Sequence, residues 1–269
     1  MREKKYLISS LILLFFTLLA CDSDKKSFAG KDSDMDSPDN HLVIDNSISD
    51  SSRLVLIEKL VNENQLIAAI KNIDFLLQQS PDNPSFLFIK ADALERLRDT
   101  SEAINFYLKA DQAAGLFFQA KMKLLQLYAE TGNPKALSLS DSLYQLPQAE
   151  KNQSNILLMK GICLTKLGKF KEAESVFDIV LKNDYTCLQA YLEKGWLYYD
   201  QQQYQKALKI FELSTIVKND FAEGYFWMAK THQQQNQQEK AILNFKKSLA
   251  LDPELTEARE ELKSLGAIQ

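Results

Sequence analysis

The chain has 269 residues, and its 32 lysines and arginines nearly balance its 36 aspartates and glutamates. This balance leaves no basic footprint for nucleic acid. With two histidines and eight glycines, the sequence contains no cluster of Cys, His and carboxylate residues at metal-ligand spacing, no glycine-rich phosphate loop and no Gly-x-Ser-x-Gly turn. We therefore expect a protein that is not an enzyme and holds neither a metal nor another cofactor.

Residues 1–20 are expected to be a signal peptide. Three of the first five residues are basic, and an apolar run follows over residues 7–18. This run is shorter than the ~20 residues that span a bilayer, and it matches the core of a secretory signal. Residues 18–21, Leu-Leu-Ala-Cys, resemble the lipobox of bacterial lipoproteins. The resemblance implies cleavage before Cys21 and acylation of Cys21; the alternative is an ordinary signal peptide with an accidental cysteine.

Residues 21–49 are expected to be a disordered acidic tether. Residues 22–50 contain eight aspartates, three lysines and one aromatic residue, Phe28, a composition that buries too little apolar surface to fold. Anionic head groups would repel such a segment and hold the rest of the chain away from the membrane. We expect a lipid-anchored protein of the bacterial cell envelope, at the outer membrane on its periplasmic or surface face. The acidic run also resembles the surface-export signal of some Bacteroidetes lipoproteins.

Six alanines recur through the rest of the chain, at Ala69, Ala103, Ala136, Ala173, Ala207 and Ala241. The differences between their successive residue numbers are 34, 33, 37, 34 and 34. A self-similarity with a period of about 34 residues is typical of stacked helix–turn–helix units. It predicts six units over residues 50–253, with bounds 50–83, 84–117, 118–153, 154–187, 188–221 and 222–253.

This pattern resembles the tetratricopeptide repeat family over nearly all of the chain after residue 50. The resemblance implies an all-α fold, a right-handed α-solenoid of about six repeats. It also implies a small residue at the eighth position of each unit, beside which an aromatic residue at the twenty-fourth position fills the space. The small residues are Ala91, Gly161, Gly195 and Ala229, and the aromatic residues are Tyr107, Phe177, Phe211 and Phe245.

Residues 254–269 are expected to form a capping helix with a polar outer face. Its apolar stripe consists of Leu255, Ala258, Leu262 and Leu265. Unit 118–153 departs from the pattern, because its turn is one residue short and its second helix is expected to end early, at Leu146-Pro147. Two interpretations of residues 146–153 stay open: a joint between two three-repeat halves, or a worn repeat without a mechanical role.

Two cysteines within one unit raise the question of a disulfide. Cys163 and Cys187 are expected to lie about 13 Å apart along the helix axis at 1.5 Å per residue. A disulfide needs Cα atoms within about 7 Å, so we expect free thiols. His232 occupies the eleventh repeat position, which in the family packs between helices, and we expect it to be a core residue rather than a ligand.

The resemblance further implies a concave groove, which the first helices line through repeat positions 2, 5, 9, 12 and 13. The candidate groove residues are Leu158, Ile162, Leu192, Trp196, Tyr199, Phe226 and Lys230, with Trp227 alongside. Tryptophan, tyrosine and phenylalanine commonly anchor protein interfaces. The alternative is that these aromatic residues cover neighbouring helices. The carboxylate clamp of chaperone-binding members is missing, because its positions hold Leu158, Ile162, Glu193, Glu223 and Trp227.

These expectations together indicate a membrane-anchored scaffold that binds a protein or peptide segment and serves an envelope assembly. Such a chain resembles pilotins, the helical lipoprotein of the barrel-assembly machine and adaptors of cell-wall hydrolases. The alternative is a structural module that self-associates without a peptide ligand; an accessory to an envelope enzyme is a third possibility. We expect neither nucleic acid nor a small-molecule substrate.

Overall fold

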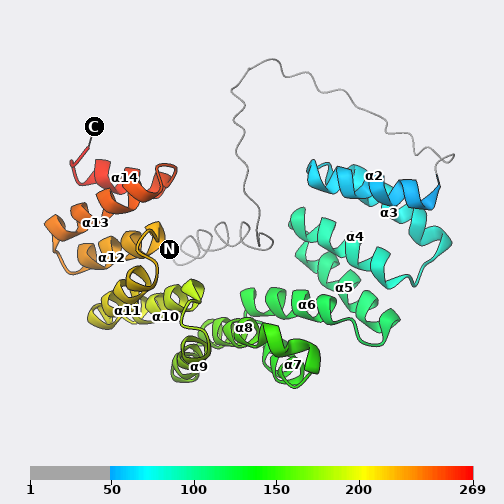
Figure 1. Ribbon diagram of the computed structural model, residues 1–269, viewed down its shortest axis with the longest axis horizontal. Coiled ribbons are helices and arrows are strands. Elements are labelled where there is room, and N and C mark those ends of the chain that lie inside the picture. Colours follow the sequence, from blue (N-terminus) through cyan, green and yellow to red (C-terminus); the bar gives the residue numbers. More distant parts are fainter. Residues whose placement is uncertain (1–48, 269) are drawn as a thin grey trace, which may run out of the picture. The chain divides into compact units, whose positions relative to one another are not determined.

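The computed structural model describes residues 49–268, which form 13 α-helices and one 3₁₀-helix (Figure 1). These residues contain no β-strand, which confirms the all-α expectation. The predicted signal peptide, Cys21 and nearly all of the predicted tether lie outside the described residues. No helix within the described range is both long and apolar enough to cross a bilayer.

Twelve of the α-helices form six consecutive pairs, each joined by a turn of three or four residues (Figure 1). The pairs are α2 (Asp50–Asn62) with α3 (Leu66–Gln79), α4 (Pro84–Arg96) with α5 (Thr100–Ala114), α6 (Phe118–Glu130) with α7 (Lys135–Tyr144), α8 (Gln153–Lys166) with α9 (Phe170–Asn183), α10 (Leu188–Asp200) with α11 (Tyr204–Val217), and α12 (Ala222–Gln234) with α13 (Gln238–Leu251). The 3₁₀-helix η2 (Pro147–Asn152) follows α7, and α14 (Thr256–Ser264) packs against α13.

A small residue on the first helix and an aromatic residue on the second hold each of four pairs together. Phe177 and Phe211 are fully buried, and a Cβ atom added at Gly161 or Gly195 would overlap their rings. The pairs α4–α5 and α12–α13 have a fully buried alanine, Ala91 or Ala229, as the small residue. The packing expected from the repeat pattern is therefore present, and lack of side-chain bulk is what lets the helices approach.

The turn inside each pair contains one residue in the left-handed backbone region. The φ angles of these residues lie between 58° and 74°, and the residues are Asn64, Arg98, Gly132, Gly168, Gln202 and Asn236. A left-handed residue at this place ends the first helix and reverses the chain. Glycine adopts it without steric cost, whereas Arg98 and Gln202 adopt it against the preference of their Cβ atoms.

The third pair is irregular, and the hydrophobic core nevertheless runs through it. Helix α7 has 10 residues and ends at Tyr144, and η2 places Ala149 in the core. One cluster of buried residues continues from Leu87 in α4 to Leu197 in α10. Helix α6 also packs directly against α8. A mechanical joint at residues 146–153 stays a prediction, since packing continues across this segment.

The two ends of the described unit differ in their packing. At the end of the chain, Ala258 and Leu262 of α14 are fully buried against the last repeat, as a capping helix requires. At the beginning, Arg53 of α2 is fully buried, donates a hydrogen bond of 2.8 Å to the Asn72 side chain and lies 4.0 Å from the centroid of the Phe75 ring. This buried arginine was not expected from the sequence.

The two cysteines and the histidine of the described unit are in the expected states. Cys163 is buried, Cys187 is partly exposed, and both are free thiols. His232 is buried, and its Nδ1 atom lies 2.8 Å from Oε1 of Gln237. Burial lowers the pKa of His232 below its usual value, as expected for a neutral core histidine.

Replacing Gly195 with alanine tests the small–aromatic contact. Helix propensity alone favours alanine over glycine by about 1 kcal/mol, but the overlap with Phe211 is expected to reverse the sign. We expect Gly195→Ala to lower the free energy of unfolding by about 1–3 kcal/mol in urea unfolding. The exposed control Lys209→Ala should change it little. A neutral or stabilising effect of Gly195→Ala would contradict the proposed packing.

Replacing Arg98 with glycine tests the left-handed turn. Arg98 is exposed and has a φ of 63°, so glycine should relieve its backbone strain and raise the free energy of unfolding by about 0.5–1 kcal/mol. Two controls separate this effect from loss of the side chain. Arg98→Ala should give no gain, and Lys109→Gly inside α5 should cost about 1 kcal/mol. Equal effects of the glycine and alanine variants at 98 would refute the explanation.

Candidate binding groove

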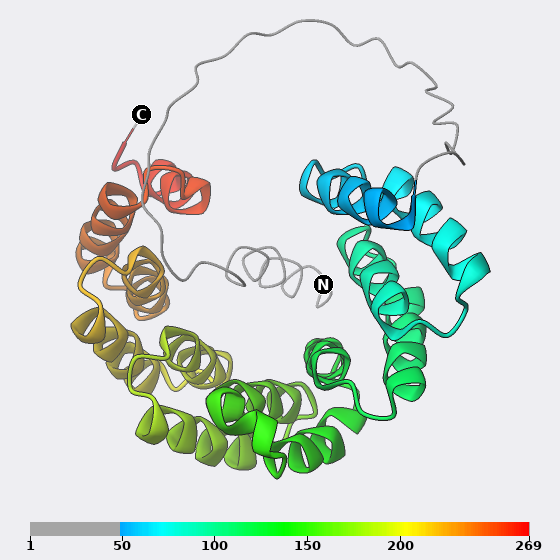
Figure 2. The same ribbon diagram turned by 45° about the vertical axis from the view of Figure 1, so that its right-hand side comes forward.

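The first helices of the pairs lie along the inner side of the curve that the described unit follows (Figure 2). This is the arrangement that the resemblance implied for α8, α10 and α12, which contain the candidate groove residues. Because each second helix packs behind its first helix, the inner wall consists of side chains from successive first helices. The cap helix α14 lies on the same side as α12 in this view.

Four partly exposed aromatic side chains gather on α10 and α12, and we call them the aromatic cluster: Trp196, Tyr199, Phe226 and Trp227. The Trp227 ring is central, with its centroid 5.4 Å from that of Trp196, 5.7 Å from that of Tyr199 and 5.5 Å from that of Phe226. All three contacts are edge-to-face, which is a favourable geometry for aromatic rings. The sequence-predicted aromatic residues are therefore brought together across two repeats.

The aromatic cluster rests on the contacts that hold the helix pairs together. The ring of Trp227 stacks at 6.0 Å on buried Phe211, and the ring of Phe226 lies 5.6 Å from buried Phe245. Both underlying rings are fully buried. Since their positions are set by the repeat packing, the exposed parts of the cluster are supported by a rigid base.

Two side-chain polar atoms on α10 and α12 are buried without a hydrogen-bond partner, namely Nε1 of Trp196 and Oε1 of Gln233. One is a donor and the other an acceptor. A buried polar group without a partner costs free energy.

The other predicted groove residues occupy different surroundings. Leu158, Ile162 and Leu192 are 5%, 6% and 2% exposed. Little of these three side chains reaches the surface, so they support the wall from below. Lys230 is partly exposed, and its Nζ atom lies 2.6 Å from Oε1 of Glu261 on α14.

Helix α14 contributes Glu261 to the wall, a residue that the sequence reasoning missed. Besides the ion pair with Lys230, Oε2 of Glu261 accepts a hydrogen bond of 3.0 Å from Gln233. Burial raises the pKa of this carboxyl, but the hydrogen bonds from Lys230 and Gln233 outweigh it and bring the pKa below its usual value. Glu261 is thus a charged, partnered residue that fixes Lys230 and Gln233 in place.

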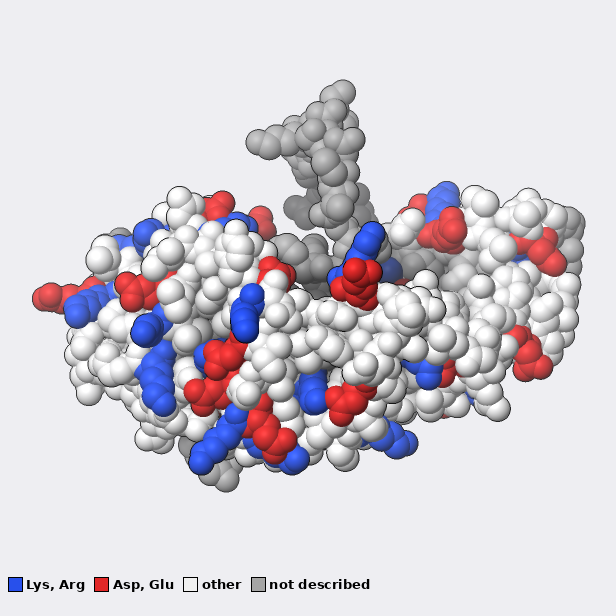
Figure 3. All heavy atoms as spheres, turned by 60° about the horizontal axis from the view of Figure 1, so that its bottom comes forward, with Lys and Arg blue, Asp and Glu red and all other residues white. Residues whose placement is uncertain are grey.

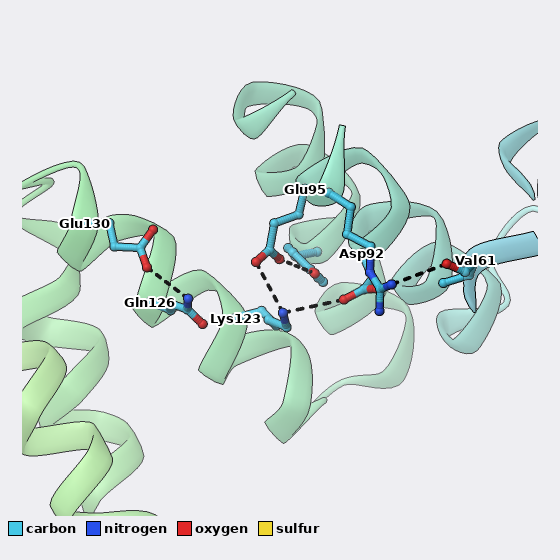
Figure 4. A network of polar contacts seen from close by, with 8 residues as sticks. Val61, Asp92, Glu95, Lys123, Gln126 and Glu130 are labelled. Carbon is cyan, nitrogen blue, oxygen red and sulfur yellow. Dashed lines mark hydrogen bonds and ion pairs between the residues drawn. The ribbon is translucent and has the colours of Figure 1, made fainter. Parts of the chain in front are cut away.

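A network of charged side chains links the first three repeats on α4 and α6 (Figure 4). Lys123 of α6 lies 3.5 Å from Asp92 and 3.2 Å from Glu95, both on α4. Arg96 pairs with Asp92 at 3.0 Å and reaches the Val61 carbonyl of α2 at 3.5 Å. Because these contacts cross repeat boundaries, they fix the relative positions of neighbouring first helices.

Two further carboxylates stand on the wall between this network and the aromatic cluster. Glu130 of α6 and Glu193 of α10 each accept a hydrogen bond of 2.9 Å from a glutamine four residues earlier, Gln126 and Gln189 respectively (Figure 4 shows the former). Burial raises the pKa of Glu130, and burial raises the pKa of Glu193 to about 7. The hydrogen bond from Gln126 and the charges of Lys123 and Lys166 lower the pKa of Glu130 without cancelling the effect of burial. The hydrogen bond from Gln189 and the charge of Lys166 act in the same way on Glu193.

Outside this wall, neither the distribution of charged side chains nor the cavities indicate a binding site for a peptide. On the face shown in Figure 3, basic and acidic side chains are interspersed. Cavities of about 340 and 320 Å³ lie on either side of α7, and residues such as Tyr144, Leu157 and Leu139 line them. Neither cavity borders the aromatic cluster.

Models of known protein families match most of the repeat region. A family model described as tetratricopeptide repeat matches residues 59–117 and 158–223. A second model with the same description matches residues 222–255. Together the two models match more than half of the chain. No curated protein matches it.

Solved structures share the fold. A tetratricopeptide repeat protein from Parabacteroides merdae is 19% identical with a TM-score of 0.64, over 80% of this chain and 83% of that one. PilW, a widely conserved type IV pilus biogenesis factor, is 17% identical with a TM-score of 0.65, over 79% of this chain and 97% of that one. The pilF protein of Pseudomonas aeruginosa is 14% identical with a TM-score of 0.57, over 80% and 96%. At these identities the likeness shows the fold alone.

Replacing Glu193 with glutamine should change how stability depends on pH. The folded-state pKa of about 7 exceeds the usual 4.5, so the folded chain holds this proton more tightly than the unfolded chain does. Stability is therefore lost as the pH rises from about 4.5 to 7. We expect Glu193→Gln to raise the free energy of unfolding at pH 8 by on the order of 1–3 kcal/mol and to change it little at pH 5.

Urea unfolding at the two pH values measures this difference. The control is Glu172→Gln, because Glu172 is an exposed carboxylate of α9 that pairs only with nearby Lys169 in the described contacts. An equal gain for Glu193→Gln at pH 5 and pH 8 would show that the carboxyl is not protonated near neutral pH.

Proposed function

Because the chain belongs to the tetratricopeptide repeat family, whose members are scaffolds for protein–protein interaction, we propose that it is a membrane-anchored lipoprotein adaptor. Its inner wall binds a segment of another protein, and the complex serves an assembly of the cell envelope. Lipidation at Cys21 holds the adaptor at a membrane and raises its effective concentration near membrane-bound partners.

The aromatic cluster is the observation that carries the binding proposal. Trp196, Tyr199, Phe226 and Trp227 present large, rigid, partly exposed surfaces on a wall built from two repeats. Such side chains bury much area on binding at a small cost in side-chain entropy, and they dominate the energetics of many interfaces. Packing within the protein accounts for the buried part of each ring. The exposed parts favour a bound segment.

The proposed envelope role rests on residues 1–21 and on the kind of protein that shares this fold. The basic start, the short apolar run and the Leu-Leu-Ala-Cys sequence before the repeats favour export and acylation. PilW, which has the same fold, is a type IV pilus biogenesis factor. By analogy of fold, which is a weaker argument than a shared site, we propose an envelope assembly as the setting.

A self-associating module is the second candidate, and the outward face of the second helices favours it. Ile216 of α11 and Leu243 of α13 are 71% and 68% exposed, and Ile179 of α9 is 44% exposed. A row of exposed apolar side chains on successive repeats is a surface through which copies of the chain could associate. Such a module would sediment as an oligomer that does not depend on the aromatic cluster.

The double variant Trp196→Ala with Tyr199→Ala separates the two candidates. We expect it to lose a partner that wild-type protein retains in its own cells after crosslinking, while the far-ultraviolet circular dichroism stays helical. Truncation of interface anchors typically costs about 2 kcal/mol or more, roughly thirtyfold in affinity. The matched control removes two outward side chains, Ile216→Ala with Leu243→Ala, and should keep the partner. Loss of an oligomer in the control alone would favour self-association.

The anchoring proposal has its own test at Cys21. Replacing Cys21 with alanine removes the acylated thiol, so the protein should move from the membrane fraction to the soluble fraction on cell fractionation. The control is Cys187→Ala, which removes a thiol of the repeat region and should leave the distribution unchanged. A Cys21→Ala protein that stays membrane-bound would refute lipid anchoring.

A further inference from the structure

The second helices of the last two pairs, α11 and α13, share a stripe of exposed outward positions. Counted from the repeated alanine of each pair, residues 206, 209, 212, 213 and 216 of α11 correspond to residues 240, 243, 246, 247 and 250 of α13. Steps of three and four residues keep each set on one side of its helix, and all ten side chains are exposed. Five of them are lysines, which we call the basic face: Lys206, Lys209, Lys240, Lys246 and Lys247.

The positive charge of this stripe is particular to the last two pairs. Among its ten positions, five lysines stand against one carboxylate, Glu212. The same positions on α3, α5, α7 and α9, counted from Ala69, Ala103, Ala136 and Ala173, hold four lysines and five carboxylates. The repeat pattern alone therefore does not produce a basic outward face, and the excess of lysines on α11 and α13 calls for an explanation of its own.

No lysine of the basic face forms an ion pair within the described residues, although other lysines of the repeats, such as Lys160, meet a carboxylate. Two of the five lie over tyrosine rings of the first helices. The Nζ atom of Lys206 is 5.2 Å from the centroid of the Tyr198 ring, and that of Lys247 is 4.0 Å from the centroid of the Tyr225 ring. These contacts hold the ammonium groups at the surface, and their charge is not neutralised by a carboxylate of the described unit.

Exposed apolar side chains lie on the same stripe as the lysines. They are Leu213 and Ile216 of α11 and Leu243 of α13. Lysines interspersed with exposed aliphatic side chains are typical of protein surfaces that lie at a membrane interface. There the aliphatic groups enter the boundary between head groups and acyl chains, while the long lysine side chains keep their ammonium groups at the level of the head groups.

We propose that the basic face is a contact surface for anionic lipid head groups, and that it gives the chain a second, reversible attachment to the membrane. Each lysine near an anionic membrane surface contributes an attraction that salt screens. The proposed anchor at Cys21 leaves room for this contact, because the 27 residues from 22 to 48 span at most about 100 Å. The anchor thus does not select which face turns to the membrane, and the charge of the basic face does.

Two other occupants of the basic face are less favourable. A second copy of the chain would bring like charges together, which disfavours binding. Residues 22–50 have the opposite charge, with eight aspartates against three lysines, but a segment that is expected to be disordered loses conformational entropy when it docks. A lipid surface carries its negative charge without that cost.

Contact through the basic face leaves the inner wall open. Each second helix packs behind its first helix, so α10 and α12 lie on the side away from the membrane (Figure 2). Both tryptophans of the chain, Trp196 and Trp227, belong to these two helices. A few lysines give reversible binding, and repulsion of the acidic tether acts against it, so a Cys21→Ala protein should still leave the membrane on cell fractionation.

Cosedimentation with lipid vesicles tests the basic face. The protein is the mature chain, residues 21–269, with Cys21→Ala so that no acyl chain contributes to binding. It should bind vesicles of equal parts phosphatidylglycerol and phosphatidylcholine and should not bind vesicles of phosphatidylcholine alone. Binding should disappear with added salt, because the screening length falls from about 10 Å at 0.1 M to about 3 Å at 1 M.

A pair of matched double variants separates the basic face from the total charge of the chain. Lys246→Gln with Lys247→Gln removes two lysines of the basic face and should weaken binding to the anionic vesicles roughly 25-fold, at about fivefold per lysine. The control, Lys71→Gln with Lys109→Gln, removes the same charge from exposed outward positions of α3 and α5 and should bind nearly as the unmodified chain does. Circular dichroism and urea unfolding verify that each variant is folded.

Tryptophan fluorescence shows which face meets the lipid. Because Trp196 and Trp227 are on the inner wall, lipids brominated in their acyl chains should not quench the fluorescence of vesicle-bound protein. Replacing Ile216 and Leu243 with alanine should weaken vesicle binding about tenfold, since less aliphatic surface enters the interface.

Several results would overturn the inference. They are a lack of binding to the anionic vesicles, equal binding to both kinds of vesicle, equal losses in the two double lysine variants, and quenching of the tryptophans. A dimer in analytical ultracentrifugation that Lys246→Gln with Lys247→Gln dissociates would assign the basic face to a second copy instead. Each of these results leaves acylation of Cys21 and peptide binding by the inner wall to their own tests.

Discussion

The contact between a small residue on one helix and an aromatic ring on the next determines the architecture of this protein. Where Gly161 and Gly195 face Phe177 and Phe211, no space remains even for one Cβ atom. A contact this close fixes the distance between two helices, and its repetition from one helix pair to the next fixes how successive pairs stack. A closely packed interior transmits such constraints because it has little free volume in which to adjust.

The inner wall inherits its order from this packing. Trp227 stacks on buried Phe211, and Phe226 lies against buried Phe245, so the exposed parts of the aromatic cluster are positioned by the rings that close the repeats. A preorganised surface loses less entropy on binding than a mobile one. The residues that hold the helix pairs together and the proposed binding residues are therefore adjacent layers of the same packing.

The fold was predictable from the sequence because it depends on local repetition. The period of the alanines, the small residue and the aromatic residue together identify each helix pair, and α14 was expected from its apolar stripe. The aromatic cluster was predicted only through the family resemblance, which maps repeat positions onto the wall. The roles of Glu130, Glu193 and Glu261 could not be predicted. Each depends on a hydrogen bond from a glutamine side chain, and the sequence period does not specify where such a side chain points. The same holds for buried Arg53, whose partners Asn72 and Phe75 lie on the neighbouring helix.

The central claim is that the inner wall, rather than the outward face, holds another polypeptide. Site-specific photocrosslinking in the protein's own cells tests this most directly, with the photoreactive residue placed at Tyr199 on α10 or at Ile216 on α11. The account predicts a discrete adduct of higher mass from position 199 and none from position 216. Adducts from position 216 alone would contradict the account, as would a lack of adducts from 199 in cells that contain the folded, anchored protein.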